Sequence, residues 1–257
     1  MEDSHLFVDQ IEKSAFVWHE RDWVHSNEFH SHQKAQLVYV TEGFQYLYTE
    51  NSRFLLPQNH AAWIPSNVSH KTSSNAATVF LRTIYYDTNH LPSFFDEFKL
   101  FTVSEVLREM ILYTEKWSKL EAYSEAEFHF LQAILLELPS FTKEAPPLYI
   151  PIPKNPNLIG ITNYINEHFN ESWDIQSIAT KFHFSTRTLE RLFKVETGIT
   201  IAKYVQLVRM IKAVELLNQN QFTISEIAYK VGYKNIQSFS NSFYQLLGSR
   251  PKDFINY

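Results

Sequence analysis

The sequence contains no cysteine among its 257 residues, and only five glycines and ten prolines. The absence of cysteine excludes disulfides, cysteine-bound zinc, iron–sulfur clusters and a thiol nucleophile, so any metal must be held by histidine, carboxylate or amide groups. The low glycine content and the hydrophobic fraction of 44% exclude collagen-like, low-complexity and largely disordered chains. We therefore predict a folded chain.

Long apolar runs are also missing. The longest, such as 61–64 and 133–136, are far shorter than the ~20 residues that span a bilayer. The acidic segment 1–5 does not lead into an apolar core with a small-residue cleavage site, so a secretory signal is not expected. We predict a cytoplasmic protein that does not interact with a membrane.

The net charge of -5 is unevenly distributed. Residues 1–153 carry 11 basic and 20 acidic side chains, and residues 154–257 carry 12 and 8, so the two parts have charges of -9 and +4. A basic C-terminal part is compatible with nucleic-acid binding at one end of the chain, although a solvated surface explains it equally well.

Five of the ten prolines lie between 146 and 156, where neither a helix nor a central strand continues easily. This density predicts a stiff linker over 144–156. It separates an N-terminal region and its helices from a C-terminal domain. The predicted domains are a β barrel over 1–100, a helical region over 101–143, and a helical domain over 157–257.

Short runs of β-branched and aromatic residues between 5 and 86 predict strands of an all-β sandwich or barrel. The pattern then changes to helical periodicity over 102–117 and 124–141. These two appended helices either pack within the monomer or pair two subunits, and the sequence favours neither alternative.

The C-terminal part contains a duplicated unit. Residues 175–198 match 224–248 at an offset of 49 in their first halves and 50 in their second halves. Each copy has the pattern of a short helix, a turn and a second helix closed by a glycine, which is the layout of a helix-turn-helix. Residues 201–218 predict a long helix that joins the copies. Asp174, Ser185 and Thr223 are the expected N-caps, and Gly232 is expected to relieve the second turn.

Residues 160–255 resemble the DNA-binding domain of the AraC family of bacterial transcription regulators. The resemblance rests on Ser185-x-Arg-x-Leu-x-Arg-x-Phe-Lys, Gly198-x-Thr-x-x-x-Tyr204, Arg209-x-x-x-Ala213-x-x-Leu-Leu217, Ile227-Ala228-x-x-Val-Gly232-Tyr233, Ser238-Phe239-x-x-x-Phe243 and Gly248-x-x-Pro251. It implies a double helix-turn-helix whose helices 186–197 and 236–247 enter successive major grooves of promoter or operator DNA. RNA polymerase is a further expected partner.

Carried onto this chain by position, the resemblance implies a set of DNA-binding residues on the exposed faces of those helices. They are Thr186, Arg187, Glu190, Arg191 and Lys194 in the first copy, and Ile236, Gln237, Ser240 and Asn241 in the second. The chain departs from the family where Asn241 and Tyr244 replace the usual Arg and Lys. This departure predicts that the second helix either binds less tightly or needs a partner.

Eight of the eleven histidines lie between 5 and 90. The spacing His30-x-His32-x-x-x-Gln36-x6-Gly43, followed by His70, resembles the two metal-binding motifs of cupin barrels. The resemblance implies a site for a divalent transition metal such as Zn, Ni or Fe, held by these histidines, with neutral Gln36 in place of the usual carboxylate. The alternative is that the histidines line a pocket for an organic ligand. Four aromatic residues are expected to line such a pocket, namely Trp18, Tyr39, Tyr46 and Trp63.

Together these features predict a multi-domain chain: an N-terminal all-β cupin-like barrel with two helices, and a C-terminal all-α double helix-turn-helix. The predicted function is a homodimeric, sequence-specific transcription regulator controlled by a small ligand or metal in the barrel, and not an enzyme. The alternative is a metal-dependent cupin enzyme fused to a DNA-binding domain. A sequence-indifferent architectural DNA-binding protein fits the negative net charge poorly.

Overall fold

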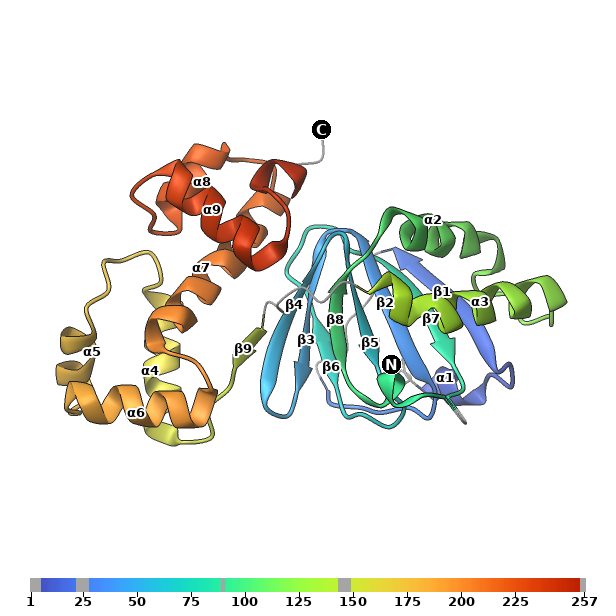
Figure 1. Ribbon diagram of the computed structural model, residues 1–257, viewed down its shortest axis with the longest axis horizontal. Helices are drawn as coiled ribbons and strands as arrows, with labels where there is room; N and C mark the ends of the chain where they lie inside the picture. The colour runs from blue at the N-terminus through green and yellow to red at the C-terminus, as the bar shows by residue number, and fades with distance from the viewer. Residues whose placement is uncertain (1–5, 22–27, 89–90, 143–148, 255–257) are drawn as a thin grey trace. The chain divides into compact units, whose positions relative to one another are not determined.

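The computed structural model describes residues 6–21, 28–88, 91–142 and 149–254 (Figure 1). Contacts divide the chain into two compact units. The first comprises Met1–Glu50 and Leu56–Pro147, and the second comprises Asn51–Leu55 and Leu148–Tyr257. Among the described residues, no helix combines the length and the apolar character that crossing a membrane would require.

The first unit is built on a five-stranded antiparallel sheet with the strand order β1-β7-β2-β5-β8. A further pair is formed by β3 and β6. Their bounds are β1 Ala15–Arg21, β2 Ala35–Glu42, β3 Phe44–Thr49, β5 His60–Ile64, β6 Lys71–Ser73, β7 Phe80–Tyr86 and β8 Lys99–Thr102. The short helices α1 (Leu6–Gln10) and η1 (Ser93–Asp96) lie outside these sheets.

Two helices cover one face of the five-stranded sheet (Figure 1). They are α2 (Glu105–Tyr113), continued by the 3-10 turn η2 (Thr114–Trp117), and α3 (Glu125–Phe141). Because side chains alternate along a strand, odd-numbered residues of β2 such as Leu37 pack against these helices, whereas Gln36 and Val38 face the interior of the unit. The fold class predicted for this region, a β domain with two appended helices, is confirmed.

The second unit is helical apart from one strand pair. Its helices are α4 (Pro156–Glu167), α5 (Ile175–Lys181), α6 (Thr186–Thr197), α7 (Ile201–Asn218), α8 (Ile224–Lys230) and α9 (Ile236–Leu247), followed by η3 (Pro251–Phe254). The strand pair joins β9 (Tyr149–Pro151) to the first residues of β4 (Ser52–Pro57). The range predicted as linker therefore contains β9 and the first residue of α4, and its residues 144–148 lie outside the described residues.

The duplicated pattern forms two helix-turn-helix units, α5–α6 and α8–α9, joined by the single helix α7 (Figure 1). The two turns contain an equivalent backbone hydrogen bond. Phe184 N donates to Ala179 O at 2.8 Å in the first copy, and Tyr233 N donates to Ala228 O at 2.9 Å in the second. Both turns contain a residue with positive φ. In the second copy it is Gly232 (84°), as predicted, and in the first copy His183 takes this conformation (59°).

Candidate functional site

The two second helices of these units, α6 and α9, begin at side-chain caps. Ser185 Oγ accepts from the N–H of Thr188, and Asn235 Oδ1 accepts from the N–H of Ser238. Each helix ends at a glycine in the left-handed conformation, Gly198 or Gly248. The predicted caps Asp174, Ser185 and Thr223 are confirmed, whereas Asn235 was not predicted.

The apolar side of each helix is buried and fixes which side is exposed. Leu189 and Phe193 of α6, and Phe239 and Phe243 of α9, are fully buried. On the opposite side of α6 lie the exposed residues Arg187, Glu190, Arg191 and Lys194. Thr186 is half-buried, and its hydroxyl donates to Gln176 Oε1 of α5 at 2.7 Å. Four of the five residues predicted in the first copy are thus exposed together.

The second copy presents a neutral face. Ile236, Gln237 and Asn241 are exposed, Ser240 is half-buried, and Gln237 Nε2 donates to Asn241 Oδ1 at 3.3 Å. A residue that the sequence analysis did not select, Arg250, reaches this face from beyond the end of α9. No helical periodicity marks Arg250, because it follows the terminating glycine.

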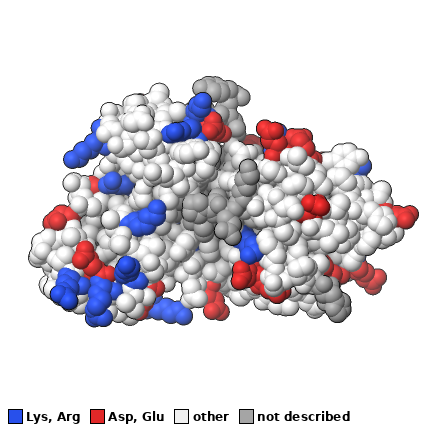
Figure 2. Space-filling model, in the orientation of Figure 1, with Lys and Arg blue, Asp and Glu red and all other residues white. Residues whose placement is uncertain are grey.

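Positively charged side chains gather on the part of the second unit that contains α5 and α6. Figure 2 shows Lys and Arg gathered over the region where Figure 1 places α6. The exposed cations of α6 are Arg187, Arg191 and Lys194. Lys194 and Lys234 also line a cleft of about 870 Å³ in the second unit. The arrangement offers cations to a polyanion along one copy and hydrogen-bonding groups along both.

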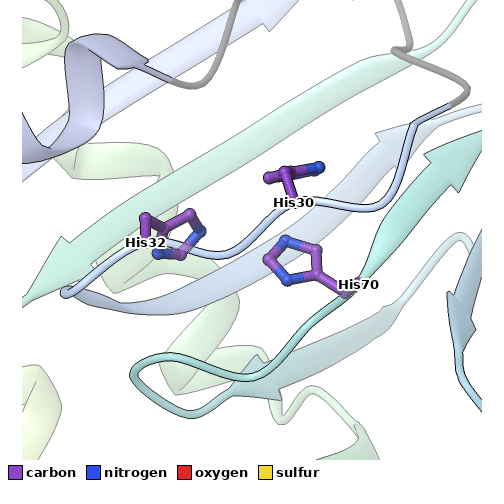
Figure 3. A group of neighbouring side chains, drawn as sticks. All are labelled: His30, His32 and His70. Carbon is purple, nitrogen blue, oxygen red and sulfur yellow. The ribbon is translucent and has the colours of Figure 1, made fainter.

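In the first unit, the three predicted histidine ligands lie together, as Figure 3 shows. His30 and His70 form a backbone bridge in which each N–H donates to the other's carbonyl at 2.9 Å, and His32 follows two residues later. One ring nitrogen of each residue lies within 4.8 Å of the others.

A backbone carbonyl lies beside one nitrogen of each ring. The Nδ1 atoms of His30, His32 and His70 lie 3.3, 2.5 and 2.8 Å from the carbonyl oxygens of Glu28, Lys34 and Val68. A neutral imidazole that donates its Nδ1–H to a carbonyl carries its lone pair on Nε2, the arrangement used by metal-binding histidines. Burial lowers the pKa of His32, which favours this neutral form.

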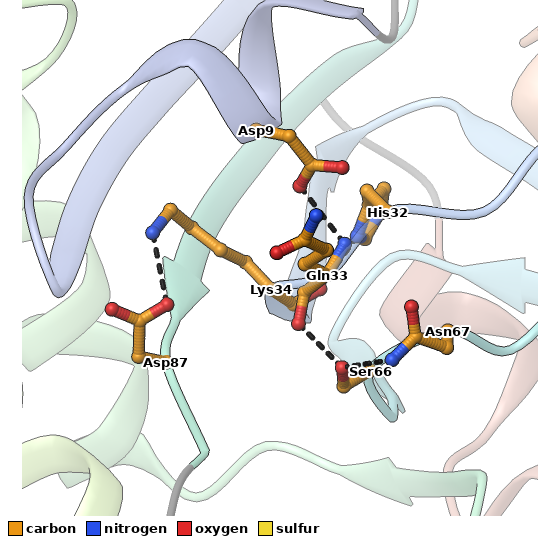
Figure 4. A network of polar contacts seen from close by, with 7 residues as sticks. All are labelled: Asp9, His32, Gln33, Lys34, Ser66, Asn67 and Asp87. Carbon is orange, nitrogen blue, oxygen red and sulfur yellow. Dashed lines mark hydrogen bonds and ion pairs between the residues drawn. The ribbon is translucent and has the colours of Figure 1, made fainter.

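A polar network holds the turn that carries His32 (Figure 4). Gln33 N donates to Asp9 Oδ1 at 2.9 Å, and Lys34 Nζ pairs with Asp87 Oδ1 at 2.9 Å. The hydroxyl of Ser66 donates to Gln33 O, and Asn67 N donates to His32 O at 2.9 Å. Contacts from several segments therefore position the His32 ring.

The histidines line a small cavity of about 30 Å³ between the five-stranded sheet and the β3–β6 pair. Gln36 lies beside them, with Oε1 3.4 Å from His32 Nε2. Gln45 also lines it and is only 1% exposed, yet within the described part of the chain its amide has no hydrogen-bond partner. An orphaned buried amide is costly, so its presence indicates that a ligand or water completes this site.

The donor set fits a divalent transition metal. Three imidazoles suit Zn, Ni or Fe, and the cavity has about the volume of one or two water-sized ligands. No carboxylate lines the cavity within the described residues. The protein side chains there would therefore leave the positive charge of a bound ion unneutralised. His30, His32 and His70 are therefore brought together as predicted, with neutral Gln36 beside them.

The four aromatic residues predicted to line a ligand pocket do not line this cavity. Tyr39 and Trp63 point to the opposite face of the sheet, where they are buried under α2 and α3. Trp18 packs on Phe7 at a different pocket, and Tyr46 packs on Phe44. This placement corrects the expectation of a shared aromatic lining. The side chains that line the cavity instead, and that the sequence analysis missed, include Gln45, Thr72, Thr83 and Tyr85.

Comparison with known proteins finds two family matches. The family described as AraC-like ligand binding domain matches residues 14–136, and a helix-turn-helix domain family matches residues 178–257. The chain is 26% identical over 228 residues to the HTH-type transcriptional regulator NimR of Escherichia coli (strain K12), a match that covers 88% of this chain and 81% of NimR.

Two shorter similarities accompany these matches. The HTH-type transcriptional activator RhaS of Citrobacter koseri is 37% identical over 90 residues, which covers 35% of this chain and about a third (32%) of RhaS. The solved C-terminal domain of AraT, a response regulator from Geobacillus stearothermophilus, is 33% identical, with 39% of this chain and 84% of that chain covered and a TM-score of 0.38. The family matches fall separately on the two units of the structure, and the chain belongs to the AraC family, as a DNA-binding transcription regulator with an N-terminal ligand-binding domain.

Proposed function

We propose that α6 and α9 read base edges in two successive major grooves of operator DNA. The observation that carries the proposal is the pair of capped helices with exposed polar faces at the two ends of α7. An 18-residue helix is about 27 Å long, and successive major grooves lie ~34 Å apart. One rigid helix therefore gives a spacing of the right order for the two copies.

The side chains of the two faces suit different contacts. Arg187 and Arg191 match guanine edges, Gln237 and Asn241 match adenine, and Glu190 matches the cytosine amine. Ile236 suits a thymine methyl, Thr186 and Ser240 offer hydroxyls, and Lys194 suits a phosphate. Charged contacts are concentrated in the first copy, so we expect it to contribute most of the affinity.

Selection of binding sites from a random duplex library tests this proposal. We expect the full-length chain to enrich a sequence with two half-sites about one helical turn apart. Binding that enriches no sequence, or affinity that is equal for selected and scrambled duplexes at the same salt concentration, would contradict sequence-specific recognition.

We further propose that the effector is a divalent transition metal bound by His30, His32 and His70 through Nε2, with the Gln36 amide as a weaker neighbour. The support is the placement of the three Nδ1 atoms beside backbone carbonyl oxygens, the orphaned Gln45 amide and the cavity volume. A cavity of about 30 Å³ is too small for an organic effector without rearrangement. When bound, the ion would supply positive charge and an exchangeable coordination position inside the unit.

Elemental mass spectrometry on untagged protein tests the metal site, with His30→Ala and His70→Ala as site variants. His129→Ala is the matched control, because His129 is exposed on α3. A stoichiometric metal that is lost in both site variants and kept in the control is the expected result. Absence of metal from all four proteins after loading with Zn, Ni or Fe would reject the metal site and leave an organic ligand that enters only when the cavity rearranges.

The effector regulates the protein only if it distinguishes two states of the DNA-binding unit. We expect operator affinity to differ between metal-loaded and chelator-treated protein, and metal affinity to change by the same factor when operator is present. Identical operator affinity in both forms, for a protein shown to bind metal, would reject control by this ion.

We also propose that the helical region pairs two copies of the chain. An open apolar groove of about 580 Å³ lies on α2 and α3, lined by Val106, Met110, Tyr113 and Phe130, and both Val106 and Tyr113 are more than half exposed. Sedimentation analysis should show a dimer that Val106→Glu converts to monomer, while Glu137→Lys, a charge change at an exposed residue of α3 that does not line this groove, does not. In vitro transcription with and without the chain tests the expected partnership with RNA polymerase.

A further inference from the structure

The two reading helices differ in charge. The sequence of α6 contains Arg187, Arg191 and Lys194, whereas α9, Ile236–Leu247, contains no charged residue. DNA binding depends strongly on cations that replace condensed counterions at the phosphates. A helix without a cation therefore needs one from a neighbouring segment if it is to hold DNA as firmly as its counterpart.

Arg250 supplies a cation to the exposed face of α9. Its Nη1 donates to the carbonyl and hydroxyl oxygens of Ser240 at 3.3 and 3.4 Å, and to Asn241 Oδ1 at 3.3 Å. The guanidinium also stacks over the ring of Tyr244, 4.6 Å from its centroid. Asn241 and Tyr244 are exposed, so the guanidinium lies at the face that the proposed function assigns to DNA.

The backbone around Arg250 is fixed by the turn that ends α9. Gly248 takes a positive φ of 71°, which turns the chain back toward the helix. The N–H of Arg250 donates to Asp253 Oδ2 at 2.8 Å, and Phe254 is buried against Phe243 of α9. The guanidinium is therefore held in place before DNA binds, which lowers the entropy cost of using it as a contact.

The guanidinium keeps donors for a further partner. Within the described residues, its hydrogen bonds to α9 all involve Nη1. The adjacent N–H groups of Nε and Nη2 form the paired donor edge with which arginine binds two oxygens of a phosphate or the O6 and N7 atoms of guanine.

We propose that Arg250 is a cationic DNA contact of the second helix-turn-helix, on the face of α9 itself, and that together with Asn241 it determines what that face binds. This inference rests on the proposed function, because it assumes that α9 faces DNA. It makes the second reading surface a composite of α9 and the segment after it. The second copy then contributes more to DNA affinity than the uncharged sequence of α9 alone indicates.

Operator titrations by fluorescence anisotropy test the proposal, with Arg250→Gln and the control Lys252→Gln. Gln removes the charge while keeping donors that can hold Ser240 and Asn241, and Lys252 is an exposed cation two residues away. We expect Arg250→Gln to weaken binding by about tenfold or more and to reduce the slope of log affinity against log salt by about one. Lys252→Gln should change affinity less than about threefold.

A second variant separates a DNA contact from a purely structural tie. Moving the charge onto the helix, in the double variant Arg250→Gln/Asn241→Arg, should restore most of the affinity and of the salt slope. Restoration with altered base preference would place the contact at a guanine edge, and restoration without it would place the contact at a phosphate. Both results support Arg250 as a DNA contact.

The proposal is overturned if Arg250→Gln binds operator like the unmodified chain. It is also overturned if that variant loses affinity only in proportion to a lowered melting temperature and Asn241→Arg restores nothing. Arg191→Ala distinguishes failure of the Arg250 contact from failure of the whole proposed DNA interface. If it alone weakens binding, only the role of Arg250 fails, and if neither variant does, the proposed DNA interface fails as well.

Discussion

The two units reach stability by different means. The N-terminal unit buries one large cluster that joins strands far apart in the sequence to α2 and α3, and it encloses polar groups such as His19, His32 and His60. In the C-terminal unit, each of the six helices from α4 to α9 begins at its own side-chain cap. Non-local packing dominates the first unit, and local helix signals recur throughout the second.

The functional groups follow the same division. The residues proposed to contact DNA lie mainly on exposed faces of α6 and α9, within short stretches of sequence. The histidine site is enclosed, and it needs His70 to pair with a segment about forty residues earlier. A change in the core should therefore disturb the histidine site strongly, whereas a surface change in the C-terminal unit should alter DNA binding without unfolding.

The largest effect on stability is expected from substitution of a glycine. Gly43 and Gly198 have similar positive φ angles, 81° and 75°. A Cβ at Gly43 would collide with the backbone oxygen of Thr78, whereas a Cβ at Gly198 would meet nothing within 4 Å. We expect Gly43→Ala to destabilise the N-terminal unit by about 3 kcal/mol or more, and Gly198→Ala to cost about 1 kcal/mol, the strain of the left-handed conformation alone.

Hydrogen exchange resolved by peptide measures the two costs separately, since each unit reports on its own protection. If the two alanine variants lost equal protection in their own units, the collision at Thr78 would be relieved by a backbone shift. Tight non-local packing around Gly43 would then cost no more to disturb than the open helix end at Gly198.

The C-terminal unit was largely predictable because its signals are local. The caps Asp174, Ser185 and Thr223, the terminating glycines and the bounds of α6, α7 and α9 all follow from neighbouring residues. The left-handed His183 was not predicted, because its conformation is imposed by the turn and not by residue type. Arg250 was missed because its role depends on the chain turning back along α9.

The histidine cluster was predictable from its resemblance to the metal-binding motifs of cupin barrels, but the rest of the cavity was not. Strand parity offered one signal: Gln36 and Tyr39 differ by an odd number along β2, so they must face opposite sides of the sheet. Gln36 lines the cavity and Tyr39 packs under the helices. Gln45 and Thr72 come from a different strand pair, and only the tertiary fold shows that they line the same cavity.

The second expected effect compares the two copies within the C-terminal unit. Arg191→Ala should weaken operator binding by about 10- to 100-fold, because it removes a charged side chain from the exposed face of α6. Asn241→Ala should cost only a few-fold, because Asn241 is neutral and its Oδ1 already accepts from Gln237 and Arg250. Gel-shift titration at one salt concentration measures both, and equal losses would show that the copies contribute alike.

A third effect distinguishes the units by pH. Burial, and then the positive charge of Arg82, lower the pKa of His19 from 6.5 to about 3. The ring is suited to its neutral form, since Nδ1 accepts from Thr83 N at 3.1 Å and Nε2 lies 2.9 Å from Thr114 Oγ1. Its contribution to stability is therefore complete above pH 6.5 and is lost as the pH falls toward 3, at no more than about 1.4 kcal/mol per pH unit.

The C-terminal unit should respond at lower pH. Hydrogen bonds from Ser177 and from Thr223 lower the pKa values of the cap carboxylates Asp174 and Glu226 below their ordinary values of 3.8 and 4.5. Their contribution is present above those values and is lost only as the pH falls below them. Urea unfolding between pH 7 and 5 should therefore weaken the N-terminal unit first. His19→Gln should flatten part of that slope, because burial also lowers the pKa values of His32 and His60 in this unit. Parallel weakening of both units, unchanged in His19→Gln, would refute this assignment.

The smallest expected effect tests whether a single local signal, the N-cap, stabilises α6. Ser185 Oγ accepts from the N–H of Thr188, so Ser185→Ala leaves that amide without its cap and should cost about 1 kcal/mol. Ser185→Gly should cost only a few tenths of a kcal/mol, because water reaches the amides and glycine suits the cap backbone. Amide exchange in α6 measures the difference. Equal losses of amide protection for alanine and glycine would mean that the packing of Leu189 and Phe193, and not the cap, determines the stability of α6. The C-terminal unit would then depend on packing in the same way as the N-terminal unit.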